Sequence, residues 1–248
     1  MSVFKRGTLI AAVAALVPLG VVVANETTSN GPSSAPVPAA SSASLGDPAT
    51  AAPDVEELIA QLTVVDELPK VPGYERDCTK DKACVYGPAW TDNYVGRDSR
   101  NGCDTRNDVL GQQLVNVTFK PGTRDCKVTG GLLHDPYTGK NIDFDPKKPS
   151  AIQIDHVFPL ARSWRAGAAN WSIEQRTAFA NDTERNLLAV DGPANQAKSD
   201  KGLDTWMPTN TDYHCDYART YLNVAATYHL AVTRGDVESA RSACALGQ

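Results

Sequence analysis

The hydrophobic pattern is clearest between residues 151 and 198, where two short apolar runs are separated by polar segments. The first run, Ala151-Ile-Gln-Ile154, leads into Asp155-His156, and the second spans Asn186–Val190. Short apolar runs bounded by polar residues favour strands. Pro193 then favours a helix, because proline is tolerated in the first helical turn. The pattern therefore predicts the order strand, loop, strand, turn and helix.

Apolar periodicity and end signals predict four further helices. The first begins at Asp54, with Glu57 at the third position of a capping box. Ser172 and Gln175 stand in the same relation before a helix that reaches about Asn181. The last two helices are expected at residues 212–232 and 236–245. The first helix carries its apolar residues on one face, so we expect it to pack against the rest of the domain.

The middle of the chain, from residue 73 to about 150, is rich in Gly, Pro, Asp and Asn. Such a composition is typical of turns and loops. Within it lie three short runs with strand character, at residues 113–119, 126–129 and 131–133. The region is therefore predicted to be an irregular β part. The predicted fold class is α+β, with a small strand-strand-helix unit embedded in helices and loops.

The N-terminus predicts export. Residues 1–24 hold Lys5 and Arg6 ahead of an apolar stretch that only Pro18 and Gly20 interrupt, which is the pattern of a signal peptide. Retention of this segment as an N-terminal anchor is the alternative. Residues 25–53 contain almost no large apolar side chain, so a disordered Ser/Ala/Pro-rich linker is expected there. Residues 54–248 are enough for one domain with a sizeable core.

The six cysteines all lie in the exported part of the chain. None of them forms a C-x-x-C pair of the kind that structural zinc sites favour. The oxidising surroundings of an exported protein favour disulfides instead. Many pairings are possible for six cysteines, and local order favours Cys78–Cys84, Cys103–Cys126 and Cys215–Cys244.

The charge balance is acidic. The chain has 24 basic and 29 acidic side chains, and loss of Lys5 and Arg6 with the signal leaves a net charge of about −7. This balance argues against a protein that holds nucleic acid through overall charge. It does not exclude an enzyme whose few cations gather at one site, since a divalent metal can supply further positive charge.

Several segments carry a resemblance to a known enzyme family. They are Ile154–Val157, Trp171–Glu174, Phe179–Asp182 and the long run Arg185–Gln196 with Lys198, together with Gly87–Trp90, Asn101–Leu110 and Asp135–Gly139. The chain resembles the secreted actinobacterial HNH endonucleases, in the branch grouped with the GmrSD-type C-terminal domain. The strand-strand-helix order resembles the ββα-metal, or His-Me finger, motif of that family. The resemblance covers most of the chain from about residue 74 to about residue 208.

The resemblance implies a one-metal site that hydrolyses phosphodiester bonds. His156 would be the general base, which suits a side chain whose ordinary pKa is about 6.5. Asp155 and the side-chain carbonyl of Asn195 would hold the metal, and Asn186 would orient His156 by hydrogen bonds across the hairpin. An asparagine stands where the family often has a third histidine, which favours Mg²⁺ or Mn²⁺ over zinc or nickel.

Basic residues near these segments are candidates for phosphate contacts, with arginine suited to forked contacts and lysine acting as a point charge. The candidates are Arg97, Arg100, Arg106, Arg185, Lys198 and Lys201. We place Arg106 in the catalytic group, because it lies in a family-like segment beside a predicted disulfide. The alternative is that these cations are solvated or pair with nearby acids such as Asp98, Asp104 and Asp200.

The leading interpretation is an exported, metal-dependent endonuclease acting on DNA, with RNA as an open alternative. Little sequence preference is expected, because no base-reading motif accompanies the site. Two other functions are considered: a catalytically silent cell-envelope binding protein on the same scaffold, and another exported hydrolase. Nucleic acid is the expected partner, no stable protein partner is implied, and a membrane is involved only if the N-terminal segment is retained. The four tryptophans are interpreted as core or loop anchors rather than base-stacking platforms, and the alternative is that Trp164 and Trp206, which flank the motif, face substrate.

Overall fold

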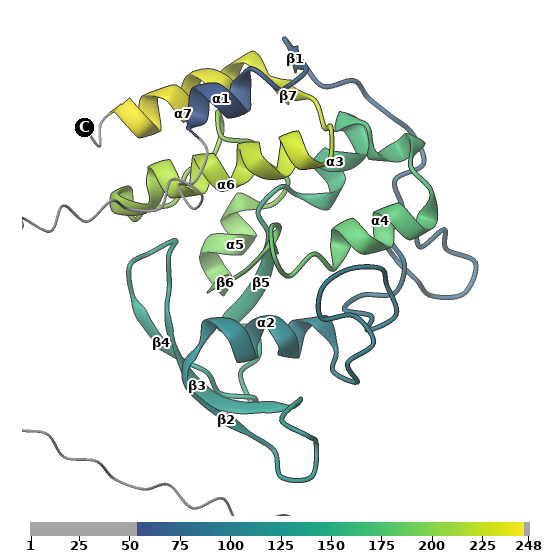
Figure 1. Ribbon diagram of the computed structural model, residues 1–248, viewed down its shortest axis with the longest axis vertical. Coiled ribbons are helices and arrows are strands. Elements are labelled where there is room, and N and C mark those ends of the chain that lie inside the picture. The colour runs from purple at the N-terminus through teal and green to yellow at the C-terminus, as the bar shows by residue number, and fades with distance from the viewer. Residues whose placement is uncertain (1–53, 246–248) are drawn as a thin grey trace, which may run out of the picture. The chain divides into compact units, whose positions relative to one another are not determined.

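The computed structural model describes residues 54–245 (Figure 1), so the predicted signal and linker lie outside the described residues. The helices are α1 (Val55–Ile59), α2 (Thr105–Gln113), α3 (Leu160–Ala166), α4 (Ile173–Ala180), α5 (Gly192–Lys198), α6 (His214–Thr227) and α7 (Arg234–Ala245). The strands are β1 (Val64–Val65), β2 (Val115–Phe119), β3 (Val128–His134), β4 (Asn141–Asp143), β5 (Ile152–His156), β6 (Leu187–Asp191) and β7 (Val232–Thr233). This mixture of helices and short strands confirms the predicted α+β class.

The strands of the described residues form three small sheets. β2, β3 and β4 are antiparallel neighbours, β5 and β6 form an antiparallel pair, and β1 pairs with β7 in parallel. In the β5–β6 pair, Asp155 lies opposite Leu188 and His156 opposite Leu187. α5 follows β6 directly and packs on both strands, while α3 and α4 belong to the connection between the strands. The predicted order of strand, loop, strand and helix is therefore present.

The β5–β6 pair lies between two hydrophobic cores, with α1, α6 and α7 on one side in Figure 1 and α2 with β2 and β3 on the other. Ile152 and Ile154 belong to the core shared with α2 and β3, whereas Val190 belongs to the larger core built mainly by the helices. Successive side chains of a strand point to opposite faces. Asp155 therefore falls on the face of the larger core and His156 on the face of the smaller one.

The sequence pattern did not predict α2, which occupies part of the region expected to be irregular β structure. Asp104 caps this helix, because its side chain accepts a hydrogen bond from the backbone N–H of Asn107 at 2.9 Å. Val109 and Leu110 are its only buried apolar side chains. Two adjacent apolar residues give no helical repeat, so the helix depends on its cap and on the core beneath it.

Several predicted ends also differ from the structure. The helix expected at residues 212–232 ends at Thr227, since His229 has a left-handed backbone (φ 52°) and Val232 enters β7. Asp54 makes no side-chain hydrogen bond that would cap α1, whereas the capping box of Ser172 and Gln175 is present as predicted. β3 is one continuous strand where two runs were expected.

Three disulfides, Cys78–Cys84, Cys103–Cys126 and Cys215–Cys244, confirm the predicted pairing. The last joins the first turn of α6 to the end of α7. Free cysteines are absent from the described part of the chain. Among residues 54–245, none of the helices is long and apolar enough to cross a membrane.

Candidate functional site

A cavity of about 480 Å³ lies at the end of β5 and brings several of the predicted site residues together. We call it the polar cavity. Its charged and polar lining comprises Arg76, Arg106, Gln153, Asp155, His156, Asn195, Ser199 and Asp200. β5 supplies Asp155 and His156, and α5 supplies Asn195. The cavity therefore lies between the end of β5 and the helix α5 that follows β6.

A close approach at Gly192 allows α5 to start beside β5. A Cβ atom at Gly192 would lie 1.9 Å from the backbone oxygen of Ser150, so only glycine fits at this position. Asp191 caps the helix by accepting a hydrogen bond from the backbone N–H of Ala194 at 2.8 Å. The first turn of α5, which leads into Asn195, is in this way held against the start of β5.

Asp155 is buried, and both of its carboxylate oxygens have protein partners. Oδ1 accepts a hydrogen bond from Nζ of Lys198 at 2.9 Å, and Oδ2 accepts one from the hydroxyl of Tyr137 at 2.5 Å. Lys198 also donates to the backbone oxygen of His156 at 2.9 Å. Burial raises the pKa of Asp155 and lowers that of Lys198, while the opposite charge of each partner opposes the shift. The carboxylate is thus held in one orientation by a fully buried cation.

His156 is held between a backbone carbonyl and an indole ring. Its Nε2 lies 2.8 Å from the backbone oxygen of Ala180 at the end of α4, and its ring stacks on Trp90 with centroids 5.6 Å apart and planes 11° from parallel. A carbonyl oxygen only accepts, so Nε2 carries the hydrogen and Nδ1 has the lone pair. Within residues 54–245, no residue forms a hydrogen bond with Nδ1. Burial lowers the pKa of His156 to about 3, which keeps the imidazole neutral.

The two predicted asparagines have different surroundings. Nδ2 of Asn195 donates to Oε1 of Gln153 at 2.9 Å, and the side-chain carbonyl oxygen Oδ1 of Asn195 has no bond to any described residue. Asn186, expected to orient His156 by hydrogen bonds across the hairpin, is fully buried, and its side chain bonds to the backbone of Phe158 instead of to His156 itself. Its Oδ1 accepts from the backbone N–H of Phe158 at 2.8 Å. Asn186 therefore fixes the chain two residues after His156. The His156 ring itself points toward the end of α4, where it bonds to Ala180.

The oxygen donors in the polar cavity fit a hard divalent cation. Mg²⁺ keeps several waters and needs only one or two protein ligands. Each carboxylate oxygen of Asp155 has a further lone pair beyond the one that Lys198 or Tyr137 uses, and the Asn195 carbonyl is available. Groups of three His, Cys, Asp or Glu side chains suited to a metal are absent from residues 54–245. The donor set suits Mg²⁺ or Mn²⁺ better than a metal that needs several nitrogen or sulfur ligands.

Of the predicted basic residues, Arg106 alone lines the polar cavity. Its Nη2 donates to the backbone oxygens of Pro149 and Ile152 at 3.1 and 3.0 Å. Arg106 therefore connects α2 to the start of β5, and one nitrogen of its guanidinium group is already engaged in these hydrogen bonds. The predicted phosphate contact of Lys198 is wrong, because this side chain is fully buried and paired with Asp155.

The other predicted phosphate ligands do not border the polar cavity. Arg97 and Arg100 are exposed on the loop before α2, and Arg185 pairs with Glu184 at 2.9 Å. Nζ of Lys201 donates to the backbone oxygen of Ala197 at 2.9 Å. These cations are close in sequence to the family-like segments, but the loop before α2 and the end of α5 direct them to solvent or to nearby acceptors. The alternative of solvated or paired cations describes them better.

Three residues at or next to the polar cavity were not predicted to have a role there. Tyr137 contacts Asp155, Trp90 stacks on His156, and Arg76 borders the polar cavity. The prediction that Trp90 is a core or loop anchor omitted its contact with the site. No spacing in the sequence relates these residues to residues 155–156. Their only common signal is that Tyr137 and Trp90 lie in segments with family-like sequence.

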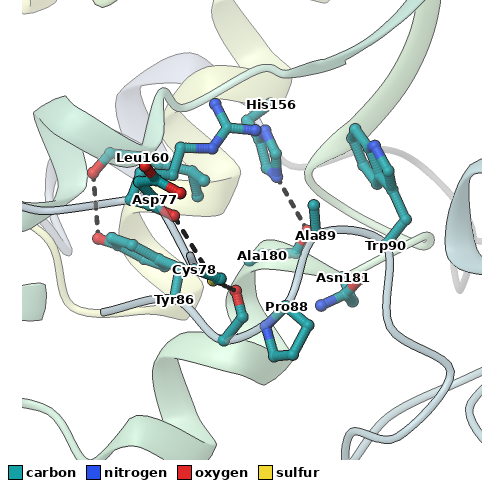
Figure 2. A pocket seen from close by; sticks show the side chains of 12 residues that line it. Asp77, Cys78, Tyr86, Pro88, Ala89, Trp90, His156, Leu160, Ala180 and Asn181 are labelled. Atoms are coloured by element: carbon teal, nitrogen blue, oxygen red, sulfur yellow. Dashed lines mark hydrogen bonds between the residues drawn. The ribbon is translucent and has the colours of Figure 1, made fainter. Parts of the chain in front are cut away.

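A second cavity, of about 490 Å³, also borders His156 (Figure 2). We call it the apolar cavity. Its walls include Tyr86, Pro88, Ala89, Trp90, Leu160 and Asn181. Figure 2 shows Tyr86 and Leu160 on one side of this space and Trp90 on the other. Arg76, Trp90, His156 and Leu160 border both cavities, so the two spaces are neighbours.

Comparisons with known proteins found similarity over much of the chain. A family model described as the C-terminal domain of GmrSD restriction endonucleases matches residues 104–237. A protein of Arthroderma benhamiae, described as an uncharacterized secreted protein, is 34% identical over 182 residues, which cover 73% of this chain and 78% of that protein. No solved structure matches the chain. The matched range of the family model includes Asp155, His156 and Asn195 but begins after Arg76 and Trp90.

Proposed function

The chain belongs to the family of the GmrSD restriction endonuclease C-terminal domain, and from this premise we propose that it hydrolyses phosphodiester bonds in the polar cavity. The family implies a nuclease with nucleic acid as its substrate. We propose further that the enzyme is of the HNH type, with β5, β6 and α5 as its ββα-metal unit. The setting of His156 carries this proposal, since one ring nitrogen is tied to a carbonyl and the other is free.

His156 acts as the general base. Hydrolysis requires a group that takes a proton from the attacking water, and the Nδ1 lone pair of a neutral imidazole can do so. The hydrogen bond from Nε2 to Ala180 holds the ring in the tautomer that this role needs. An anionic phosphate beside the ring favours the protonated form, so substrate raises the low pKa of His156 toward a useful value.

Arg76 and Arg106 supply positive charge for the substrate. Both border the polar cavity, whereas the chain as a whole carries a net charge of −5. A local pair of guanidinium groups can orient one phosphate through charge-assisted hydrogen bonds. The acidic remainder of the surface gives little further attraction for a polyanion. We therefore propose contact with the phosphates next to the cleaved bond rather than with a long track of backbone.

Asp155 and Asn195 hold the divalent cation, Mg²⁺ or Mn²⁺. When bound, such a cation neutralises charge that develops on the phosphoryl oxygens and on the leaving oxygen. Lys198 and Tyr137 orient the Asp155 carboxylate through its two oxygens. Gln153 orients the Asn195 amide, so that its carbonyl is the atom left for the cation. Each proposed ligand is thus fixed by a second side chain, as is usual around metal sites.

The protein is exported and acts outside the cytoplasm. The relative from Arthroderma benhamiae is described as secreted, and three disulfides are consistent with an oxidising compartment. The signal pattern at residues 1–24 supports the same location. We propose DNA as the principal substrate and RNA as the alternative, cut with little sequence preference.

Digestion of circular nucleic acids tests the proposed function. With Mg²⁺ or Mn²⁺, the protein should open supercoiled plasmid and circular single-stranded DNA, because only an endonuclease can cut a molecule without ends. EDTA should abolish the cutting, and an RNA substrate should be run beside the DNAs. Binding of DNA without any cutting across a panel of divalent metals would support the silent binding protein instead. Hydrolysis of a small ester alone would support another hydrolase.

The ligand role of Asn195 predicts a change in metal requirement. Asn195→Ala should raise the Mg²⁺ concentration needed for half-maximal cleavage by about tenfold or more, since loss of groups around a metal typically costs 10–100-fold in affinity. Gln196→Ala, at the exposed neighbouring position on α5, is the matched control and should behave like wild type. Calorimetric titration with Mn²⁺ measures binding without turnover. Equal metal affinity in Asn195→Ala and wild type would contradict the assignment.

A further inference from the structure

The apolar cavity has no part in the mechanism proposed above, although it shares His156 and three other lining residues with the polar cavity. It is bordered by Tyr86, Pro88, Trp90 and Leu160. Small-molecule sites typically have volumes of roughly 300–1,000 Å³ and apolar or aromatic walls with a few polar groups. At about 490 Å³, this cavity is large enough for one flat, mainly apolar group.

Asn181 provides an unusual polar group in this wall. It is 1% exposed, and its Nδ2 donates to the backbone oxygen of Thr177 at 2.9 Å. Its carbonyl oxygen Oδ1 is buried and has no hydrogen-bond partner among the described residues. Buried acceptors are normally paired, so an unpaired one in a residue that lines the cavity offers a place for a donor from a bound group. The group that enters should therefore be flat and apolar on its faces, with an N–H at its edge.

A nucleobase meets this description. We infer that the apolar cavity receives one unpaired base of the nucleotide next to the cleaved phosphate, with Asn181 accepting a hydrogen bond from the base edge. This inference rests on the proposed nuclease function. Every nucleobase has an N–H donor on its Watson–Crick edge, and pairing in a duplex occupies that donor. Arg76 borders both cavities, so its charge lies where the backbone would pass from one cavity to the other.

The consequence is a preference for single-stranded nucleic acid. A base within a duplex must be unpaired and unstacked before it can enter this cavity, whereas a single strand offers free bases. Stacking and apolar contact tolerate any base, so the cavity adds strand preference without strong sequence preference. A single-stranded oligonucleotide should be cut about tenfold or more faster than the same sequence in a duplex.

Ala89→Phe tests the inference by filling the cavity. Ala89 borders the cavity, is exposed and has an ordinary backbone conformation, so a larger side chain can be placed there. The variant should raise the KM for a single-stranded oligonucleotide by about tenfold, the scale of losing one stacked base, and should have a smaller effect on duplex cutting. Ala83→Phe is the matched control, because Ala83 is exposed on the neighbouring disulfide loop but does not border the cavity. Thermal melting checks that both variants are folded.

Asn181→Ala is a second variant, used if Ala89→Phe melts below wild type. It should slow cutting of the single strand while the rate on the duplex changes less. Equal wild-type rates on single strand and duplex would overturn the inference, as would equal losses on both substrates in the two cavity variants. If wild type cuts neither substrate with any metal, the proposed function itself fails, which distinguishes the two outcomes.

Discussion

Replacing His156 by alanine should lower the rate of phosphodiester hydrolysis by about 10²–10⁴-fold, the usual contribution of a general base. The imidazole is the group in the polar cavity with a free nitrogen lone pair and a fixed tautomer. Single-turnover cleavage of a labelled oligonucleotide at saturating Mg²⁺ measures this loss. His134→Ala is the matched control, since His134 is exposed, bonds to Asn141 and does not border either cavity.

The outcome that would contradict the assignment is a His156→Ala protein that retains more than about a tenth of the wild-type rate.

The pH dependence of folding gives a check that does not involve turnover. Burial lowers the pKa of His156 to about 3, so between pH 3 and about pH 6.5 the unfolded chain binds a proton there that the folded protein does not. The stability linked to His156 is therefore complete above about pH 6.5 and falls as the pH falls through this window. Urea unfolding of the metal-free proteins should show a smaller loss on acidification in His156→Ala than in wild type.

Replacing Lys198 by methionine should lower the free energy of unfolding by about 3–5 kcal/mol, because it leaves the Asp155 carboxylate buried without its counter-charge. Lys198 is fully buried and its Nζ lies 2.9 Å from both Oδ1 of Asp155 and the backbone oxygen of His156. Methionine keeps much of the side-chain volume, so the loss reports the charge and its hydrogen bonds. Urea unfolding at pH 7 measures it.

Lys201→Met is the control for this experiment, since Lys201 is exposed and follows Lys198 closely in the sequence, just after the end of α5. Its loss should stay within the range of about 0.5 kcal/mol that is usual for surface substitutions. The double variant Asp155→Asn with Lys198→Met should regain part of the stability, because no buried charge is then left alone. A Lys198→Met protein as stable as wild type would contradict the buried ion pair.

Much of the local structure was predictable because its signals are short. The apolar runs at residues 151–154 and 186–190 became β5 and β6, and the Ser172 capping box formed as expected. The disulfides also follow the order of the cysteines along the chain. α2 is the exception, because its few apolar residues give no repeat and its stability comes from the core that it covers.

The roles of the basic residues were less predictable, since position in sequence does not tell where a long side chain ends. Lysine is rarely fully buried, so a surface role for Lys198 was the natural expectation. The packing of α5 on β5 directs this side chain inward to Asp155 instead. Arg97 and Arg100 lie close to Arg106 in sequence, yet only Arg106 borders the polar cavity.

The residue pattern alone predicts that Asp155 and His156 end a strand, that a second strand pairs with it, and that a helix carrying Asn195 follows. These features depend on residue spacing and on backbone conformation over a few positions. The partners of the side chains, in contrast, follow from the packing of the folded chain. Tyr137 and Lys198 lie 18 and 43 positions from Asp155, and the carbonyl of Ala180 lies 24 positions from His156. Such contacts depend on how separate elements pack, because packing and not sequence distance determines which atoms are enclosed together.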